Sequence, residues 1–100
     1  MIIYEVEMTN QADQDIENIC KYIALDSIDN SISFIKKFQY KIKNTLSIFP
    51  EKHRKYKNGN VWCYWNYLIF FEILKKEKTV NVIRIINSAQ YLQYKNLNII

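Results

Sequence analysis

Two amphipathic segments separated by a short polar break constrain the fold of this chain more than any other feature of its sequence. In the first segment, apolar side chains recur at the spacing of one helix face, at Ala12, Ile16, Ile19, Cys20 and Ile23. In the second, the same spacing runs through Ile32, Ile35, Phe38, Ile42, Leu46 and Phe49. Because the break at residues 26–30 is short, we predict two antiparallel helices of about 15 and 20 residues.

The ends of the predicted helices carry the usual signals. Thr9 or Asn10 offers an N-cap to the first helix, and the acids that follow suit the positive end of the helix dipole. Pro50 ends the second helix, because proline disfavours the α conformation in the residue before it.

Segments with strand character flank the two helices. Residues 2–8 alternate between apolar and polar side chains, which predicts a half-buried strand. Three more strands are expected at residues 61–65, 68–74 and 79–86, joined by short polar links. The polar residues 51–60 are expected to form a loop with a turn at Gly59. Residues from Asn87 onward fit either a short C-terminal helix or an ordered tail.

This order of elements predicts an α+β fold in one domain over residues 1–100. Two antiparallel helices would pack on a four-stranded, mainly antiparallel sheet, in the order β-α-α-β-β-β. The apolar share of 49%, with one Gly and one Pro, argues against a disordered chain. With no apolar run of membrane-spanning length and no basic leader at the N-terminus, we expect a cytoplasmic protein without membrane contact.

The residue types that bind metals are scarce. The chain has two cysteines, Cys20 and Cys63, and one histidine, His53, which together cannot make a convincing zinc site. We expect both cysteines to be small buried hydrophobes and His53 to be an isolated loop residue. The sequence therefore predicts no metal and no organic cofactor.

Charge is distributed unevenly along the chain. Residues 1–35 carry a net charge of −6, residues 36–57 of +7 and residues 58–100 of +3. The basic middle is compatible with a surface for nucleic acid or for an acidic protein, and equally with a solvated, lysine-rich face.

Four sequence motifs in the same order resemble the RelE/ParE superfamily of toxins from type II toxin–antitoxin systems. They are Ala-Asp-Gln-Asp-Ile at 12–16, Leu-Ser-Ile-Phe-Pro at 46–50, Asn-Tyr-Leu-Ile-Phe-Phe at 66–71 and Val-Ile-Arg-Ile-Ile at 82–86. The resemblance covers nearly the whole chain. It implies two helices over a four-stranded sheet and a cognate antitoxin that neutralises the toxin in a hetero-oligomer.

The resemblance also implies one of two activities. RelE-like members are endoribonucleases that cut mRNA on the ribosome, whereas ParE-like members block DNA gyrase and are not enzymes. For a RelE-like protein, the resemblance points to Arg84 as the catalytic cation, with Tyr91 or Tyr94 in proton transfer. The basic residues Lys52, Arg54, Lys55 and Lys57 would bind the target or its phosphates, unless they are only a solvated loop.

Two of the cations expected in a nuclease are missing. Residues 87–90, where many relatives carry His or Arg, are Asn-Ser-Ala-Gln, and the position near Trp62 and Cys63 is not basic. Together with the long helical hairpin, these absences favour the ParE branch, a gyrase inhibitor of the plasmid-stabilisation type. Arg84 then has the alternative of a structural ion pair, because an unpaired arginine in an apolar strand is costly.

The aromatic residues at positions 62, 64 and 65 and the missing cations each fit two interpretations. Trp62, Tyr64 and Trp65 are expected either to bind the antitoxin or to pack in the core and on the sheet. The missing cations also fit a non-catalytic binding module, such as a toxin that has lost its activity.

Overall fold

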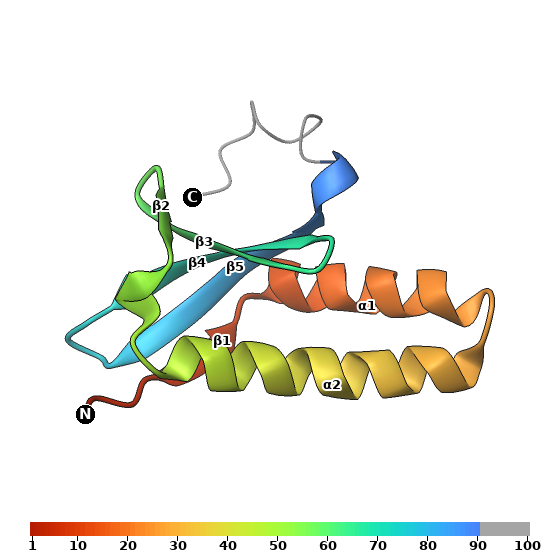
Figure 1. The fold of residues 1–100 in the computed structure, drawn as a ribbon, viewed down its shortest axis with the longest axis horizontal. Helices are drawn as coiled ribbons and strands as arrows, with labels where there is room; N and C mark the ends of the chain where they lie inside the picture. Colours follow the sequence, from red (N-terminus) through yellow and green to blue (C-terminus); the bar gives the residue numbers. More distant parts are fainter. Residues whose placement is uncertain (91–100) are drawn as a thin grey trace.

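The computed structural model describes residues 1–90, which form two helices and five strands (Figure 1). In chain order these are β1 (Glu5–Met8), α1 (Asn10–Ala24), α2 (Ile28–Ser47), β2 (Arg54–Tyr56), β3 (Gly59–Tyr64), β4 (Tyr67–Leu74) and β5 (Thr79–Asn87). Two single 3-10 turns, η1 (Pro50–Lys52) and η2 (Ser88–Gln90), follow α2 and β5. Of the C-terminal segment for which a helix or a tail was expected, Asn87 ends β5, Ser88–Gln90 form η2, and the rest lies outside the described residues.

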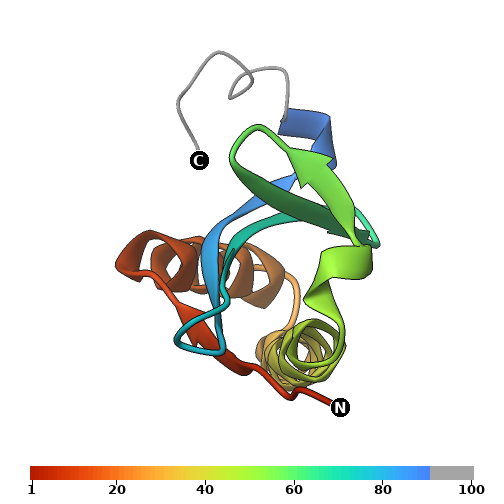
Figure 2. The same cartoon turned by 90° about the vertical axis from the view of Figure 1, so that its left-hand side faces the viewer.

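The predicted helical hairpin is confirmed, with helices of 15 and 20 residues. The side chain of Thr9 caps α1 by accepting a hydrogen bond from the backbone of Ala12, and Ser27 caps α2 in the same way. Viewed end-on in Figure 2, the two helices lie next to each other, and the β2–β3 hairpin lies at the edge of the sheet away from α1.

Two residues assigned to the buried face of α2 are in fact exposed. Ile32 lies near the start of α2, where the hairpin extends past the sheet (Figure 1), and it is 49% exposed. Phe49 lies beyond the end of the helix, because Ile48 is already extended and Phe49 adopts a left-handed conformation before Pro50. The remaining positions of the predicted face, Phe38, Ile42 and Leu46 above all, are buried.

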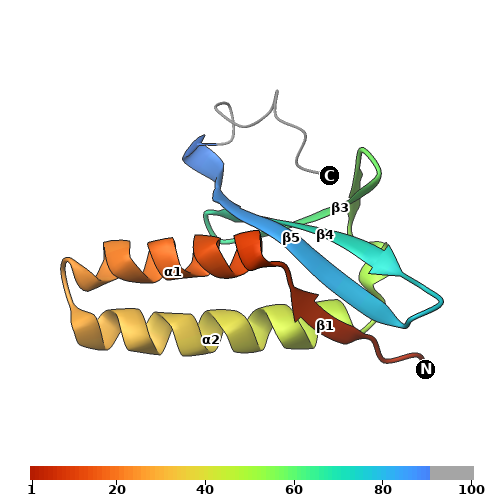
Figure 3. The same cartoon turned by 180° about the vertical axis from the view of Figure 1, so that it is seen from behind.

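The sheet has five strands and is mixed, so the prediction of four mainly antiparallel strands was incomplete. The strand order is β1-β5-β4-β3-β2, in which β1 runs parallel to β5 and the other pairs are antiparallel (Figure 3). The additional strand, β2, comes from the polar segment expected to be a loop. Its turn falls at Lys57 and Asn58, where Lys57 has a φ of 50°, so that Tyr56 pairs with Gly59.

The main core lies between the helices and one face of the sheet. It contains the fully buried side chains of Phe38, Ile42, Leu46, Ile69, Phe71, Val80 and Val82, among others. A smaller cluster on the opposite face contains Phe70 and Ile86. A register shift between Phe70 and Phe71 leaves Ile83 without a strand partner and pairs Arg84 with Phe70. Within residues 1–90, neither helix is long and apolar enough to cross a membrane.

Candidate functional site

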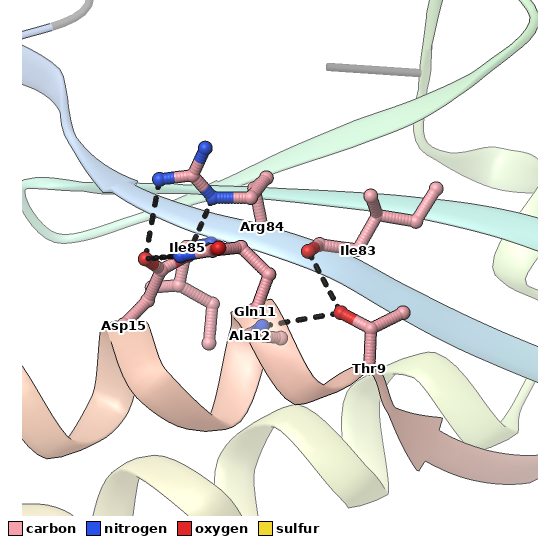
Figure 4. Close-up of polar contacts among 7 residues, drawn as sticks. All are labelled: Thr9, Gln11, Ala12, Asp15, Ile83, Arg84 and Ile85. Carbon is pink, nitrogen blue, oxygen red and sulfur yellow. Dashed lines mark hydrogen bonds and ion pairs between the residues drawn. The ribbon is translucent and has the colours of Figure 1, made fainter.

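The beginning of α1 is attached to the part of β5 that β1 does not reach. Strand β1 ends at Met8, opposite Val82, and leaves the next residues of β5 without a strand neighbour on that side. Thr9 donates its backbone N–H to the Val82 carbonyl at 2.9 Å. Its hydroxyl donates to the Ile83 carbonyl, also at 2.9 Å (Figure 4). The N-cap residue of α1 therefore also continues the hydrogen bonding of β1 along β5.

Asp15 continues this attachment six residues further along the chain, on α1. Its Oδ2 accepts a hydrogen bond of 2.9 Å from the backbone N–H of Ile85, and its Oδ1 accepts one of 3.3 Å from Gln11. The side chain is only 8% exposed. A buried carboxylate requires such donors, because burial without them costs several kcal/mol.

Arg84 forms a two-point ion pair with the same carboxylate (Figure 4). Its Nε lies 2.8 Å from Oδ2 of Asp15, and its Nη2 lies 3.2 Å from Oδ1. Its side chain is 19% exposed. The Asp15 carboxylate thus offsets the positive charge that the sequence offered for catalysis.

An open groove of about 420 Å³ runs beside this ion pair, between α1 and the end of β5. Tyr22 of α1 and Tyr67 of β4 contribute its aromatic wall, and Asn18 and Asn87 its amides. Burial raises the pKa of the Tyr67 hydroxyl, and the nearby Tyr22 raises this pKa further. The phenol of Tyr67 is therefore protonated at neutral pH and can act as a donor, not as a base. Tyr91 and Tyr94, the candidates for proton transfer, lie outside the described residues.

The basic loop residues form a second group at the other edge of the sheet. Lys52, Arg54, Lys55 and Lys57 are all exposed, on η1, β2 and the β2–β3 turn. Lys52 and Arg54 line a shallow pocket of about 330 Å³, together with Trp62 and Cys63. The Nζ atom of Lys57 lies 5.6 Å from the centre of the Tyr56 ring.

His53 also lines this second pocket. Its ring lies 5.8 Å from that of Trp62 and 5.9 Å, edge-on, from that of Phe71. Its Nε2 is buried and has no hydrogen-bond partner among residues 1–90. Burial lowers the pKa of His53, and the positive charge of Lys52 lowers it further, so the imidazole is neutral at pH 7.

The structure does not bring Arg84 together with the basic loop. Strands β4 and β3 separate β5 from β2 in the sheet. Three strand spacings correspond to about 14 Å. Arg84 is in addition held on the α1 side of β5 by Asp15. One phosphate group therefore cannot contact both sets of cations in this arrangement.

The three aromatic residues expected to act together have different environments. Trp62 and Tyr64 stack with ring centres 5.2 Å apart on the helix side of the sheet, where Tyr64 also stacks on Phe38. Trp65 lies in the β3–β4 turn with a φ of 55°, and 73% of its side chain is exposed. Only Trp65 therefore offers a large free surface to a partner.

One of the two cysteines differs from expectation. Cys20 is half-buried in α1, whereas Cys63 is exposed on β3, so the prediction of a buried thiol was wrong for Cys63. Both thiols are free. Within residues 1–90, no three potential metal ligands among His, Cys, Asp and Glu gather at one place.

Asp15 is the site residue that the sequence analysis missed. It was read as one of several acids near the start of a helix, yet it lies three residues after Ala12 and four before Ile19, on the apolar stripe. An acid on the buried face of a helix and an arginine in an apolar strand each require a partner of opposite charge, so the two together indicate an ion pair.

Comparisons with known proteins agree with this fold. The family model described as "ParE toxin of type II toxin-antitoxin system, parDE" matches residues 6–91. The chain resembles the RelBE2 toxin–antitoxin complex from Mycobacterium tuberculosis with a TM-score of 0.65 and 16% identity, over 87% of this chain and 93% of that one. It resembles the chromosomal ParDE system from P. aeruginosa with a TM-score of 0.69 and 13% identity, over 85% and 96% of the two chains. No curated protein sequence matches significantly.

Proposed function

Because this chain belongs to the ParE toxin family of type II toxin–antitoxin systems, within the RelE/ParE superfamily, we propose that it inhibits DNA gyrase and is not itself a nuclease. In this proposal it acts in the cytoplasm and is held inactive by a cognate antitoxin. The proposal concerns the target, since the two toxin branches share one fold.

The ion pair between Arg84 and Asp15 is the observation that carries this proposal. A nuclease must direct positive charge at the phosphate that becomes more negative in the transition state. Here the Arg84 guanidinium already shares two hydrogen bonds with a carboxylate, at 2.8 and 3.2 Å. Residues 87–90 supply no other cation next to it.

Purified protein tests the proposal in two parallel assays. We expect it to inhibit supercoiling of relaxed plasmid by bacterial gyrase and to leave mRNA on programmed ribosomes intact. Cleavage of that mRNA without an effect on supercoiling would overturn the proposal. Activity in neither assay would also overturn it, in favour of a binding module without toxic activity.

The second candidate function is a RelE-like mRNA interferase, and the pocket beside β2 is the observation that favours it. Lys52, His53 and Arg54 line one pocket, which brings two cations and a neutral imidazole together in one place. In that case Arg54→Ala should strongly reduce cleavage of ribosome-bound mRNA. Lys37→Ala, which removes a lysine from the exposed face of α2, should leave this cleavage unchanged.

For the antitoxin we propose a surface that includes Trp65. The similar solved structures are toxin–antitoxin complexes, and Trp65 is the most exposed aromatic residue of the three that were predicted to bind the antitoxin. Trp65→Ala should weaken binding of the protein encoded by a short adjacent reading frame about tenfold or more. Tyr40→Ala removes an equally exposed aromatic residue in the middle of α2 and should leave this affinity unchanged.

A further inference from the structure

The two ends of the helical hairpin carry exposed apolar patches that the proposed function does not use. The first, which we name the tip patch, consists of Tyr22, Leu25, Ile28 and Ile32 where α1 meets α2. The second, the base patch, consists of Ile2, Ile3, Ile48 and Phe49 at the opposite end. Figures 1 and 3 show the α1–α2 connection and the N-terminal segment at opposite ends of the molecule.

The tip patch is apolar and acidic. Each of its four side chains is between 49% and 82% exposed. Leu25 and Ile28 lie on either side of the short connection, and Ile32 follows Ile28 by one turn of α2. Residues 22–35 contain two aspartates, Asp26 and Asp29, and no lysine or arginine. Of the lysines that flank this segment, Lys21 forms an ion pair with Glu17 and Lys36 lies one turn after Ile32.

The base patch is held together by backbone pairing. Ile3 and Ile48 form an antiparallel bridge, which places residues 2 and 3 beside residues 48 and 49. The four side chains are between 43% and 64% exposed. The pairing therefore joins two short segments, distant in sequence, into one apolar surface.

Phe49 in this patch has a strained backbone. Its φ of 48° and ψ of 58° lie in the left-handed region, which is unfavourable for a bulky residue. The ring of Phe49 nevertheless gains little burial within residues 1–90, since 62% of it is exposed. Backbone strain clusters at functional positions of proteins, and here it holds an aromatic ring in solvent.

Basic residues outnumber acids around the base patch. Lys52 and Lys55 follow Phe49 in the chain, and the β4–β5 turn at this end adds three further lysines at 75, 76 and 78. Their acidic neighbours are Glu5, Glu51 and Glu77. Lys78 lies directly beside β1, since its carbonyl accepts the backbone N–H of Glu5.

We propose that the tip patch of one copy of this chain docks on the base patch of the next, head to tail. One surface is apolar and acidic, the other apolar and basic, and the two lie too far apart to meet within one molecule. An interface between two different patches is heterologous, so it permits growth beyond a dimer. Each patch holds four apolar side chains, which corresponds to a small interface and to weak, concentration-dependent association.

Sedimentation velocity of the full-length wild-type protein over a concentration series provides the first measurement. We expect the weight-average mass to rise steadily past that of a dimer, and to fall when salt screens the charges. A wild-type protein that remains monomeric over the series would overturn the proposal.

Two single variants each remove one patch. Phe49→Asn deletes the ring at a position where asparagine tolerates the left-handed backbone, and Leu25→Lys adds an opposing charge at the exposed end of α1. Each alone should weaken self-association about tenfold or more. Tyr40→Ala lies outside both patches and serves as the control, with association equal to that of the wild type.

Mixing the two variants separates this proposal from a symmetric dimer. Phe49→Asn retains the tip patch and Leu25→Lys retains the base patch, so a 1:1 mixture should form dimers and stop there. If the mixture stays monomeric, or if either variant alone still associates like the wild type, head-to-tail docking is wrong. These outcomes do not depend on whether gyrase is the target.

Discussion

The carboxylate of Asp15 accepts hydrogen bonds from the Arg84 guanidinium and from the backbone of the next residue, Ile85. Burying either charged group alone would carry a large desolvation penalty, and the pairing of the two charges offsets this penalty. The same contacts fix the rotation of α1 against β5, because they involve both backbone and side chain of the strand. At the scale of single residues, the ion pair thus stabilises the fold and engages the main catalytic candidate at the same time.

Asp15→Asn should lower the free energy of unfolding by about 2–3 kcal/mol, because it leaves the charge of a mostly buried arginine without its counter-charge. Urea denaturation monitored by circular dichroism measures this change. Asp13→Asn, which alters an exposed acid in the first turn of the same helix, should cost less than about 1 kcal/mol. Equal losses for both variants would contradict the role assigned to Asp15.

His53 should make stability depend on pH. Its pKa is lowered in the folded protein, so the unfolded chain binds a proton more readily than the folded one. Stability should therefore be fully present above the unfolded pKa of about 6.5 and decline as pH falls below it. Thermal unfolding from about pH 7.5 to about 5.5 should show a steeper loss for the wild type than for His53→Gln. Parallel curves would show that His53 does not titrate in this way.

The sequence was sufficient to assign residues to the buried or exposed face of a helix where apolar residues recur at helical spacing. It was not sufficient where a buried position holds a polar residue. The positions of Phe38, Ile42 and Leu46 followed from helical spacing alone. Asp15 did not, because an acid near a helix start is usually solvated and its partner lies 69 residues away. Phe49 was misplaced because it continues the helical spacing of apolar residues, although Pro50 already disfavours a helical backbone at this position.

At the scale of elements, α1 takes over the role of a strand. Strand β1 pairs with only four residues of β5, and Thr9 and Asp15 satisfy backbone groups of β5 beyond it. A helix that begins immediately after a strand can do this because its N-cap and first turns lie beside the neighbouring strand. The junction thus joins the hairpin firmly to the sheet.

Thr9→Ala should cost about 2 kcal/mol of stability, since it removes both a helix cap and a hydrogen bond to the Ile83 carbonyl. Ser27→Ala removes only a cap, at the start of α2, and should cost about 1 kcal/mol. Chemical denaturation of both variants and of Thr9→Ser, which keeps the hydroxyl, measures the difference. A loss of stability for Thr9→Ala no larger than that for Ser27→Ala would show that the hydrogen bond from Thr9 to the Ile83 carbonyl does not stabilise the fold.

Elements with a strong apolar period could be predicted, and the one without it could not. Both helices follow from helical spacing and β1 from alternation, whereas β3, β4 and β5 follow from apolar and aromatic runs joined by short polar links. Strand β2 is only three residues long, and two of these are exposed cations, so its pairing depends on the β2–β3 turn and not on an apolar face. The parallel pairing of β1 with β5 likewise depends on contacts between the two ends of the chain.

At the scale of the whole molecule, the hairpin covers one face of the sheet and separates the features that concern function. The α1–β5 groove with the ion pair lies at one edge of the sheet, and the basic residues on η1 and β2 lie near the other. The order of elements predicted a helical hairpin on a sheet, four sequence motifs indicated the family by resemblance, and the fifth strand and the parallel pairing of β1 were not predicted. The separation of Arg84 from the basic loop required the strand order, which the sequence does not reveal.

The most direct test of this account is gyrase supercoiling in the presence of wild-type protein and of the double variant Asp15→Asn with Arg84→Gln. The double variant replaces the ion pair with two amides that can still bond to each other and to Ile85, and circular dichroism checks that it folds. Because Arg84 has no chemical role in this account, both proteins should inhibit supercoiling. A wild-type protein that leaves supercoiling unchanged but cuts ribosome-bound mRNA, with cleavage abolished in the double variant, would contradict it.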